Sequence, residues 1–521
     1  MGSGVVGCDQ RIAWLLTTAR LLGPDPVLAR RDGFIKALAE QGVHVDSSRV
    51  SRWESGLHPL PMRVASTYES VLGLTEGSLV AVTAGLRRAF GNGTVPKESA
   101  LKDSDLPDAD LDRMLDLAEG GGATGGHWLR LAAQLHRYER VYLRQHEWAK
   151  LSGRLVAELG SSVGVGHVRR FEAAASLIRH PNAQRHLSRA LGTFVMNPDT
   201  QVVAPVLHLL TEVSDEAAGD LVLRMLHSES KNIRSAAASV AAVKVARGHF
   251  AETALRDLEA HVVGSLRRGH SLDERLDSFD LAVQLPDHSW ARAMGGLRNR
   301  RAFDLVEHAR KEGQLVPRAQ TAPFVNELSA AVQAGTPTHY PHEPDAMLRR
   351  LLREALLHAH KARRHHAALL LAASPYAPAI ARHCQNLASH RNDLLAARAW
   401  TVLMRVGPGE RRPRVLLQSM AETRPPIRAR ALVNLGLHPD PISPEEAGIL
   451  IGQLAEFARP NERHATMFAL GMAAPADLAT LVDHEDEQVR RSAAWWRVQG
   501  PALHDSDVAP APAPGVMPEI D

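Results

Sequence analysis

The spacing of apolar residues along the chain predicts helices almost throughout. From Asp110 to about Gly500, apolar residues recur three and four positions apart, in segments separated by Pro, Gly or Asn-Asp clusters. Residues 10–90 hold shorter amphipathic segments with tight turns between them. No segment shows the alternation of a half-buried strand. We therefore predict an all-α fold.

Two stretches interrupt this pattern. GNGTVPKESALKDSDLPDAD, at 91–110, is rich in Gly, Pro, Ser and Asp and lacks periodic apolar residues, as a linker does. The end of the chain, from His504, is Pro/Ala-rich and acidic, which favours disorder. These breaks predict a small helical domain over 10–90, a linker over 91–109, a large helical domain over 110–500 and a disordered tail over 501–521.

Composition fits an intracellular helical protein. Of the 521 residues, 45% are hydrophobic, 23% are charged and only 4% are aromatic, and the abundance of Ala and Leu favours helix over strand. The two cysteines, Cys8 and Cys384, are too far apart in sequence to suggest a disulfide framework, so we expect a reducing, cytoplasmic compartment. No apolar run has the length of a membrane span, and the first ten residues lack the features of a signal peptide.

A pair of short helices is predicted between residues 31 and 56. In RRDGFIKALAEQGVHV the apolar residues around Phe34 and Leu38 share one face of a helix that Gly42 ends. Asp46 is placed to cap a second helix, which runs from Ser47 to about Ser55 and closes at Gly56. Two short helices joined by a turn are the layout of a helix-turn-helix.

The second helix has an inner and an outer face. Val50 and Trp53, at i and i+3, are expected to point inward, and we interpret Trp53 as core and Glu54 as a structural hydrogen-bonding residue. The side chains left to point outward are Ser47, Ser48, Arg49 and Arg52.

LAEQGVHVDSSRVSRWESG, Leu38 to Gly56, resembles the lambda-repressor-like (Xre-type) helix-turn-helix family of bacterial transcription regulators. LHPLPMRVASTYESVLGLTEGSL, residues 57–79, is similar to the Pro-containing loop and following helix that complete such domains. In one departure, GVHVDSSRVS is one or two residues longer between the turn and the second helix than the family pattern. The resemblance implies double-stranded DNA as partner, with the second helix in the major groove and a homodimer on a two-fold-related site.

By this resemblance Ser47, Ser48, Arg49 and Arg52 are the residues that face DNA. Arginine can pair bidentately with guanine, whereas serine hydroxyls and helix N-terminal amides suit phosphate. The alternative is a capped, solvated helix in a small bundle that binds no nucleic acid.

Several later segments look alike and suggest repeats. Arg428 and Arg463 stand 35 residues apart, and Leu435-Gly436 and Leu470-Gly471 keep the same spacing. Repeats of this size built from helix pairs predict an α-solenoid, and their turn-then-Val/Ile-Arg-x-x-Ala character resembles HEAT repeats. The alternative is a generic helical bundle. The related segments begin at Asn232, Asp393, Pro426, Glu462 and Gln488.

Charge is unevenly distributed along the chain. Between Ala346 and Arg430 there are 16 Arg/Lys and four Asp/Glu, a balance of +12 in a chain whose net charge is +3. A basic stripe on a curved repeat surface could follow a DNA backbone, and the alternative is a set of solvated faces and inter-repeat ion pairs. The candidates for auxiliary backbone contact are Arg349, Arg350, Arg363 and Arg364.

No catalytic or metal-binding pattern was found. In HAHKARRHH, His358 and His365 would share a helical face, but no nearby carboxylate or thiolate completes a site, so a solvated face is the preferred interpretation. There is no Ser-His-Asp elbow, Walker loop, HExxH or paired zinc cysteines. We expect no cofactor, no metal and no enzymatic activity.

The sequence as a whole predicts a sequence-specific DNA-binding transcriptional regulator in the cytoplasm, associated with the nucleoid. Its helical repeats would serve dimerisation, sensing or contact with a protein partner. Two alternatives remain open: a HEAT-like DNA-processing or repair enzyme, and a protein-binding scaffold with accessory DNA binding.

Overall fold

The computed structural model describes residues 6–90, 108–268, 272–339, 343–408, 412–437, 442–457 and 459–501. Within these ranges the chain forms 28 α-helices and two short 3-10 helices, with one isolated bridge between Gln314 and His358. The all-α prediction is confirmed. The predicted linker lies outside the described residues except for its last two positions, which begin α7, and so does the predicted tail after residue 501. None of the described helices is both long and apolar enough to cross a membrane.

The first six helices contain the predicted helix pair. They are α1 (Cys8–Leu21), α2 (Pro26–Ala29), α3 (Arg31–Glu40), α4 (Ser47–Glu54), α5 (Met62–Val71) and α6 (Ser78–Phe90).

The middle of the chain continues with further helices. They are α7 (Asp108–Gly120), α8 (Gly125–Leu135), α9 (Gln145–Ser161), α10 (Gly164–Leu177), α11 (Gln184–Met196), α12 (Ala204–Leu207), η1 (His208–Glu212), α13 (Glu216–Met225), α14 (Lys231–Ala246), α15 (Glu252–Arg268), α16 (Leu272–Gln284), α17 (Asp287–Gly295) and α18 (Arg300–Glu312).

The last part of the described chain is again helical. It comprises α19 (Arg318–Ala334), α20 (Ala346–Leu357), α21 (Lys361–Ala372), α22 (Ala377–Leu387), α23 (Asp393–Val406), α24 (Arg412–Ala421), α25 (Pro425–Gly436), α26 (Pro444–Glu456), α27 (Pro460–Ala473), η2 (Asp477–Leu481) and α28 (Glu487–Gln499).

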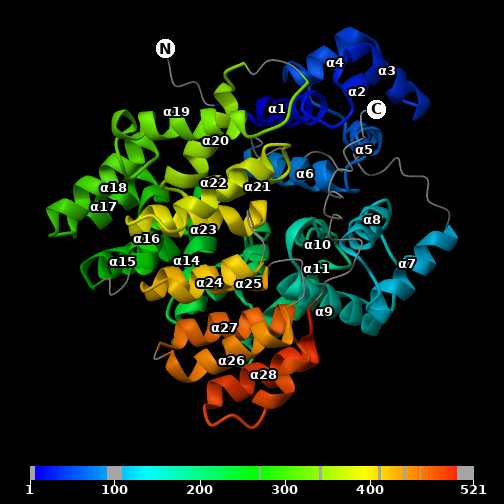
Figure 1. Ribbon diagram of the computed structural model, residues 1–521. Coiled ribbons are helices and arrows are strands. Elements are labelled where there is room, and N and C mark those ends of the chain that lie inside the picture. The colour runs from blue at the N-terminus through cyan, green and yellow to red at the C-terminus, as the bar shows by residue number, and fades with distance from the viewer. Residues whose placement is uncertain are drawn as a thin grey trace.

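Two hydrophobic clusters form the core. One consists of apolar side chains between Met114 and Val306. The other joins residues of the N-terminal helices, from Ile12 to Leu86, with residues from Leu328 to Trp496. Figure 1 shows the same arrangement, with α1 beside α20 and α6 beside α21. The N-terminal helices, which include the predicted DNA-binding helix, therefore share a hydrophobic core with the C-terminal helices.

The C-terminal helices are stacked in order. α23 packs on α25, α25 on α27 and α27 on α28, while α22, α24 and α26 each pack on the helix that follows them in the chain (Figure 1). Each helix pair therefore buries an apolar face against its neighbour, which is the packing expected of repeats. The relation of these pairs to HEAT repeats stays a prediction.

One turn recurs at the start of five helices. In each case a side chain accepts a hydrogen bond, of 2.9–3.2 Å, from the backbone N–H two residues later, and that later residue is the N-cap of the helix. Three of these turns are 32 residues apart, at 358, 390 and 422. The pairs are Ser228 with Ser230, His358 with His360, His390 with Asn392, Glu422 with Arg424 and His484 with Asp486.

An arginine completes three of these turns. Arg234, Arg364 and Arg490 each donate from Nη1 to the carbonyl oxygens five and six residues earlier. Backbone carbonyls in the turn before a helix have no partner within the helix. A guanidinium that donates to two of them holds this turn, and therefore the first residues of the helix, in one conformation. The recurring arginine is thus part of the fold at α14, α21 and α28.

Candidate nucleic-acid interface

The predicted helix pair is formed by α3 and α4. Phe34 and Leu38 of α3 are fully buried, and the N–H of Val43 donates to the Leu38 carbonyl at 2.9 Å, which ends the helix. Gly42 has a φ of 78°, a left-handed conformation that favours glycine. Six residues, 41–46, then lead into α4, so the longer connection noted in the sequence is accommodated as an extended loop.

Asp46 caps α4. Its Oδ1 accepts from the backbone N–H of Arg49 at 2.7 Å and from the Ser48 hydroxyl at 2.9 Å. These hydrogen bonds hold the pKa of the Asp46 carboxyl below its ordinary value because they favour the charged form. The predicted cap and the predicted start of the helix at Ser47 are both confirmed.

The two faces of α4 differ as expected. Val50 and Trp53 are buried, at 0% and 4% exposure, which confirms their inward direction. The Arg49 guanidinium carbon lies 5.9 Å from the centre of the Trp53 ring, a cation–π distance that restrains the side chain. The four side chains predicted to point outward, Ser47, Ser48, Arg49 and Arg52, are all exposed.

The far end of α4 is anchored to α1. Arg20 donates from Nε and Nη2 to the two carboxylate oxygens of Glu54, at 2.6 and 2.7 Å, and both side chains are 4% exposed. The Thr17 hydroxyl donates to the Glu54 carbonyl at 3.1 Å. Glu54 therefore has the structural role that we expected for it, and the direction of α4 is set by α1.

Gly56 lies where the chain leaves α4 and passes close to α1. Its φ is 72°, and a Cβ at this position would lie 3.1 Å from the backbone of Asp9 and Gln10. Glycine is therefore required there by both conformation and space.

α1 in turn is held by α20. Arg11 is fully buried and donates to Glu354 at 2.7 Å, and the Trp14 indole N–H donates to Asp345 at 2.8 Å. Trp14 also stacks on Tyr376 with ring centroids 6.2 Å apart. These partners are more than 300 residues apart in sequence, so no local pattern could have revealed them.

α6 makes a second connection to the body. Arg88 pairs with Glu172 of α10 and, at 3.3 Å, with Glu212 of η1, and Arg247 of α14 also reaches Glu212 at 3.2 Å. The Phe90 ring lies between two guanidinium groups, which belong to Arg11 at 4.8 Å and Arg363 at 4.7 Å. Side chains of both charges thus fix α6 between the two hydrophobic clusters.

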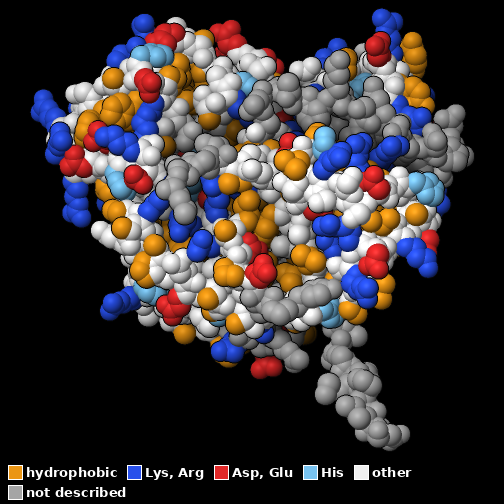
Figure 2. All heavy atoms as spheres, turned by 90° about the horizontal axis from the view of Figure 1, so that it is seen from above, with side chains coloured by type: hydrophobic (Ala, Val, Ile, Leu, Met, Phe, Trp, Pro, Cys, Tyr) orange, Lys and Arg blue, Asp and Glu red, His pale blue; other side chains and the backbone are white. Residues whose placement is uncertain are grey.

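The basic stripe predicted for auxiliary DNA contact is largely used inside the protein. Arg364 is 6% exposed and donates to the carbonyls of His358 and Ala359, in the turn before its helix, so its proposed contact with the DNA backbone is wrong. Arg363 is half-buried against Phe90, and Arg350 is paired with Glu354 at 3.1 Å. Of the four, only Arg349 is exposed. Figure 2 shows Lys and Arg side chains in several places on this face, many of them next to Asp and Glu side chains.

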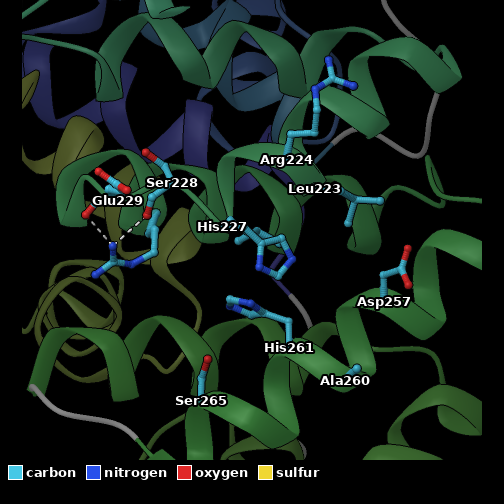
Figure 3. Close-up of a pocket in the computed structure, with 11 residues that line it drawn as sticks. Leu223, Arg224, His227, Ser228, Glu229, Asp257, Ala260, His261 and Ser265 are labelled. Carbon is cyan, nitrogen blue, oxygen red and sulfur yellow. Dashed lines mark hydrogen bonds between the residues drawn. The ribbon is translucent and has the colours of Figure 1, made fainter. Parts of the chain in front are cut away.

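A separate pocket of about 820 Å³ lies between α13 and α15. In Figure 3 the rings of His227 and His261 point toward one another across it, with centroids 6.1 Å apart. The dashed lines at Ser228 and Glu229 mark the arginine bonds of the recurring turn. Among the described residues, no group of three or more His, Cys, Asp or Glu is placed to hold a metal ion. We assign no chemistry to this pocket.

Comparison with known proteins does not assign the chain to a family. No protein-family model and no curated protein matches the chain. Among solved structures, the chain is similar to one described as the crystal structure of an engineered protein, with 14% identity over 95% of this chain and 99% of that chain. The TM-score is 0.21, so this similarity carries no argument about fold or function.

Proposed function

We propose that the protein is a sequence-specific DNA-binding regulator that reads the major groove with α4. The observation that carries the proposal is the exposure of Ser47, Ser48, Arg49 and Arg52 on one capped helix whose opposite face is buried. Two arginines three positions apart share a face and can each present a planar donor pair to a guanine. The Ser47 hydroxyl suits a phosphate, whereas the Ser48 hydroxyl and the Arg49 N–H already donate to Asp46.

The rigidity of α4 supports this function. A reading helix must hold its side chains in one register on the duplex, and α4 is fixed at its start by Asp46 and at its end by the Arg20–Glu54 pair. We further propose a homodimer on two half-sites, because one such helix touches few base pairs, and a nucleoid location that follows from DNA binding. The stacked helices would serve dimerisation, sensing or a protein partner.

Selection from a random duplex pool with the full chain tests the proposal. We expect a defined motif to be enriched, and the double variant Arg49→Ala/Arg52→Ala to lose about 1–3 kcal/mol of binding free energy per base contact. Arg185→Ala/Arg189→Ala, on the exposed face of α11, removes the same charge and is the matched control. Enrichment of no motif, or equal effects of the two double variants, would overturn the assignment of α4.

A further inference from the structure

A short extended segment joins α8 to α9. Residues 140–144 belong to no helix or turn, and the exposure of their side chains alternates along the chain. The exposed side chains are Arg140, Tyr142 and Arg144, and the half-buried ones, which pack against a hydrophobic cluster, are Val141 and Leu143. Successive side chains therefore point to opposite sides, as they do in a β-strand.

The backbone of this segment is held to the protein through one of its edges. The Val141 N–H donates to Oδ1 of Asn182, just before α11, at 3.1 Å. In an extended chain the N–H and C=O of one residue point to one edge, and those of its two neighbours point to the other edge. The backbone groups of Arg140 and Tyr142 therefore point away from Asn182, and they have no hydrogen-bond partner among the residues that the structure describes.

Two tyrosines make the segment unusual for a protein surface. Tyr142 is 91% exposed and Tyr138 is 45% exposed. The Tyr142 ring therefore contributes almost nothing to packing within the fold. Tyrosine and arginine are enriched at the centres of protein interfaces, and an open strand edge is a template for pairing with another chain. The segment thus has the side chains and the backbone of a contact surface.

The order of the residues matches a second copy of the same segment. When two copies run antiparallel about a two-fold axis at Val141, Arg140 of each copy lies opposite Tyr142 of the other. Each of these cross-strand neighbours is a guanidinium and an aromatic ring, which attract one another. The next positions outward, Tyr138 and Arg144, repeat the same combination. The segment is therefore complementary to itself.

The backbone favours the same register. Arg140 and Tyr142 would exchange N–H and C=O hydrogen bonds with Tyr142 and Arg140 of the second copy. Val141 would occupy the position that makes no such bonds, which agrees with the use of its N–H by Asn182. An axis at Arg140 would set Arg140 opposite itself, and an axis at Tyr142 would set Arg140 opposite Arg144, so like charges disfavour both.

We propose that residues 138–144 form the contact between two copies of this chain, by antiparallel pairing about Val141. The inference names a surface for the homodimer of the proposed function, and only its use on DNA rests on that function. A contact of this size is small beside the roughly 1,200–2,000 Å² of stable interfaces, so we expect a Kd on the order of 10–100 µM. On adjacent half-sites DNA would hold two copies close together and so favour the contact.

Sedimentation of the full chain over a range of concentrations, without DNA, tests the contact. Tyr142→Arg sets arginine opposite arginine, and we expect the Kd of the dimer to rise roughly 10-fold or more. The Tm should not change, because the side chain is 91% exposed. The double variant Arg140→Tyr/Tyr142→Arg restores arginine opposite tyrosine and should dimerise as the wild type does. A surface that does not pair with itself would show no such rescue.

Matched controls and a covalent test accompany these variants. Met196→Arg adds the same charge at another exposed apolar side chain and should leave dimerisation unchanged. In Val141→Cys the two Cα atoms would lie about 4.5 Å apart across the axis, within the range of a disulfide. Mild oxidation should therefore give a covalent dimer, whereas Lys150→Cys, at an exposed position of α9, should not.

The proposal is overturned if the wild type is still a monomer at ~0.5 mM, or if Tyr142→Arg dimerises as Met196→Arg does. It is also overturned if the double variant is not rescued, or if Val141→Cys forms a disulfide no faster than Lys150→Cys. None of these results bears on reading by α4, because DNA is absent. Conversely, Arg49→Ala/Arg52→Ala should dimerise as the wild type does, so failure of the DNA test would leave this contact in place.

Discussion

The guanidinium of Arg20 and the carboxylate of Glu54 form a buried, two-bond ion pair that joins α1 to the last residue of α4. The two residues are 34 positions apart, and neither side chain has more than 4% of its surface exposed. A buried pair of this kind need not stabilise the fold relative to apolar residues, but it fixes one arrangement of the helices that it links.

Replacing one partner of this pair should therefore be costly. Arg20→Met removes both hydrogen bonds to the buried Glu54 carboxylate and leaves only the half-exposed Arg31 guanidinium 4.0 Å away, so we expect a loss of about 3–5 kcal/mol in the free energy of unfolding. Urea unfolding of the full chain measures it. The exposed pair of Arg300 and Asp304 provides the control, since Arg300→Met should cost less than about 1 kcal/mol. Similar losses in the two variants would contradict the structural role of the pair.

Two glycines with the same backbone conformation allow the cost of backbone strain to be distinguished from the cost of a steric clash. Gly42 and Gly56 have φ values of 78° and 72°, but a Cβ would meet nothing within 4 Å at Gly42 and the α1 backbone at 3.1 Å at Gly56. Gly42→Ala should cost about 1–2 kcal/mol of stability from the left-handed conformation alone. Gly56→Ala should cost more and also weaken DNA binding, because it pushes the end of α4 from α1. Equal costs in thermal unfolding would show that the contact does not constrain α4.

The docking of α1 on α20 predicts energetic coupling between Arg11 and Glu354. A double-mutant cycle of Arg11→Met and Glu354→Gln should give a coupling free energy of about 1–3 kcal/mol, since both side chains are largely buried. The exposed pair of Arg144 and Glu147 should give about 0.5 kcal/mol or less. A coupling near zero for Arg11 and Glu354 would mean that the N-terminal helices are not held by this contact.

These pairs show where sequence reasoning succeeds. Asp46 and the start of α4 could be predicted because a cap and the helix that it starts are local, and their signals lie within a few residues. The inward direction of Val50 and Trp53 follows from helical periodicity for the same reason. Arg20 and Glu54, or Trp14 and Asp345, come together only through tertiary packing, and nothing in the spacing of the residues encodes it.

The prediction for Arg364 in the basic stripe was wrong for a related reason. The count of charges between Ala346 and Arg430 does not say which side chains point to solvent. Arg364 points inward and, as Arg234 and Arg490 do, closes a turn. A signal was present in the sequence, because each of these arginines follows a His or Ser by six positions and is followed by alanines three and four positions later. It becomes recognisable once the hydrogen bonds show which positions are equivalent.

Because of Lys244, the free energy of unfolding should depend on pH above about pH 8. Burial lowers the pKa of its ammonium group from the ordinary 10.5 to about 8, and Nζ donates to the carbonyls of Leu210 and Val213. Between these two pKa values the unfolded chain binds the proton and the folded chain does not, so this group makes the protein more stable as pH rises from 8 toward 10.5, by on the order of 3 kcal/mol. Below pH 8 both states are protonated and the contribution is constant.

The variant Lys244→Met isolates this contribution. Any other group that titrates between these pH values is present in both proteins, so the difference between wild type and variant reports Lys244 alone. Urea unfolding at pH 7.5 and pH 9.5 should give a wild-type gain that the variant lacks. A difference that stays the same at the two pH values would show that Lys244 keeps an ordinary pKa.

Substitutions of Arg349 and Arg364, both in the basic stripe, should have different effects on stability and on DNA binding. Arg364→Gln leaves the carbonyls of His358 and Ala359 without their donor, and we expect it to cost about 1–3 kcal/mol of stability. It should not change how DNA affinity depends on salt, because a buried guanidinium displaces no counterion. Arg349→Gln should leave stability within about 0.5 kcal/mol and reduce the slope of log affinity against log salt by about 0.9 if its exposed guanidinium meets phosphate. DNA affinity and stability of both variants are measured across a salt series. A flatter slope with unchanged stability in Arg364→Gln would restore the stripe as a DNA-binding surface. An unchanged slope in Arg349→Gln would leave α4 and its neighbours as the sole proposed contact with DNA.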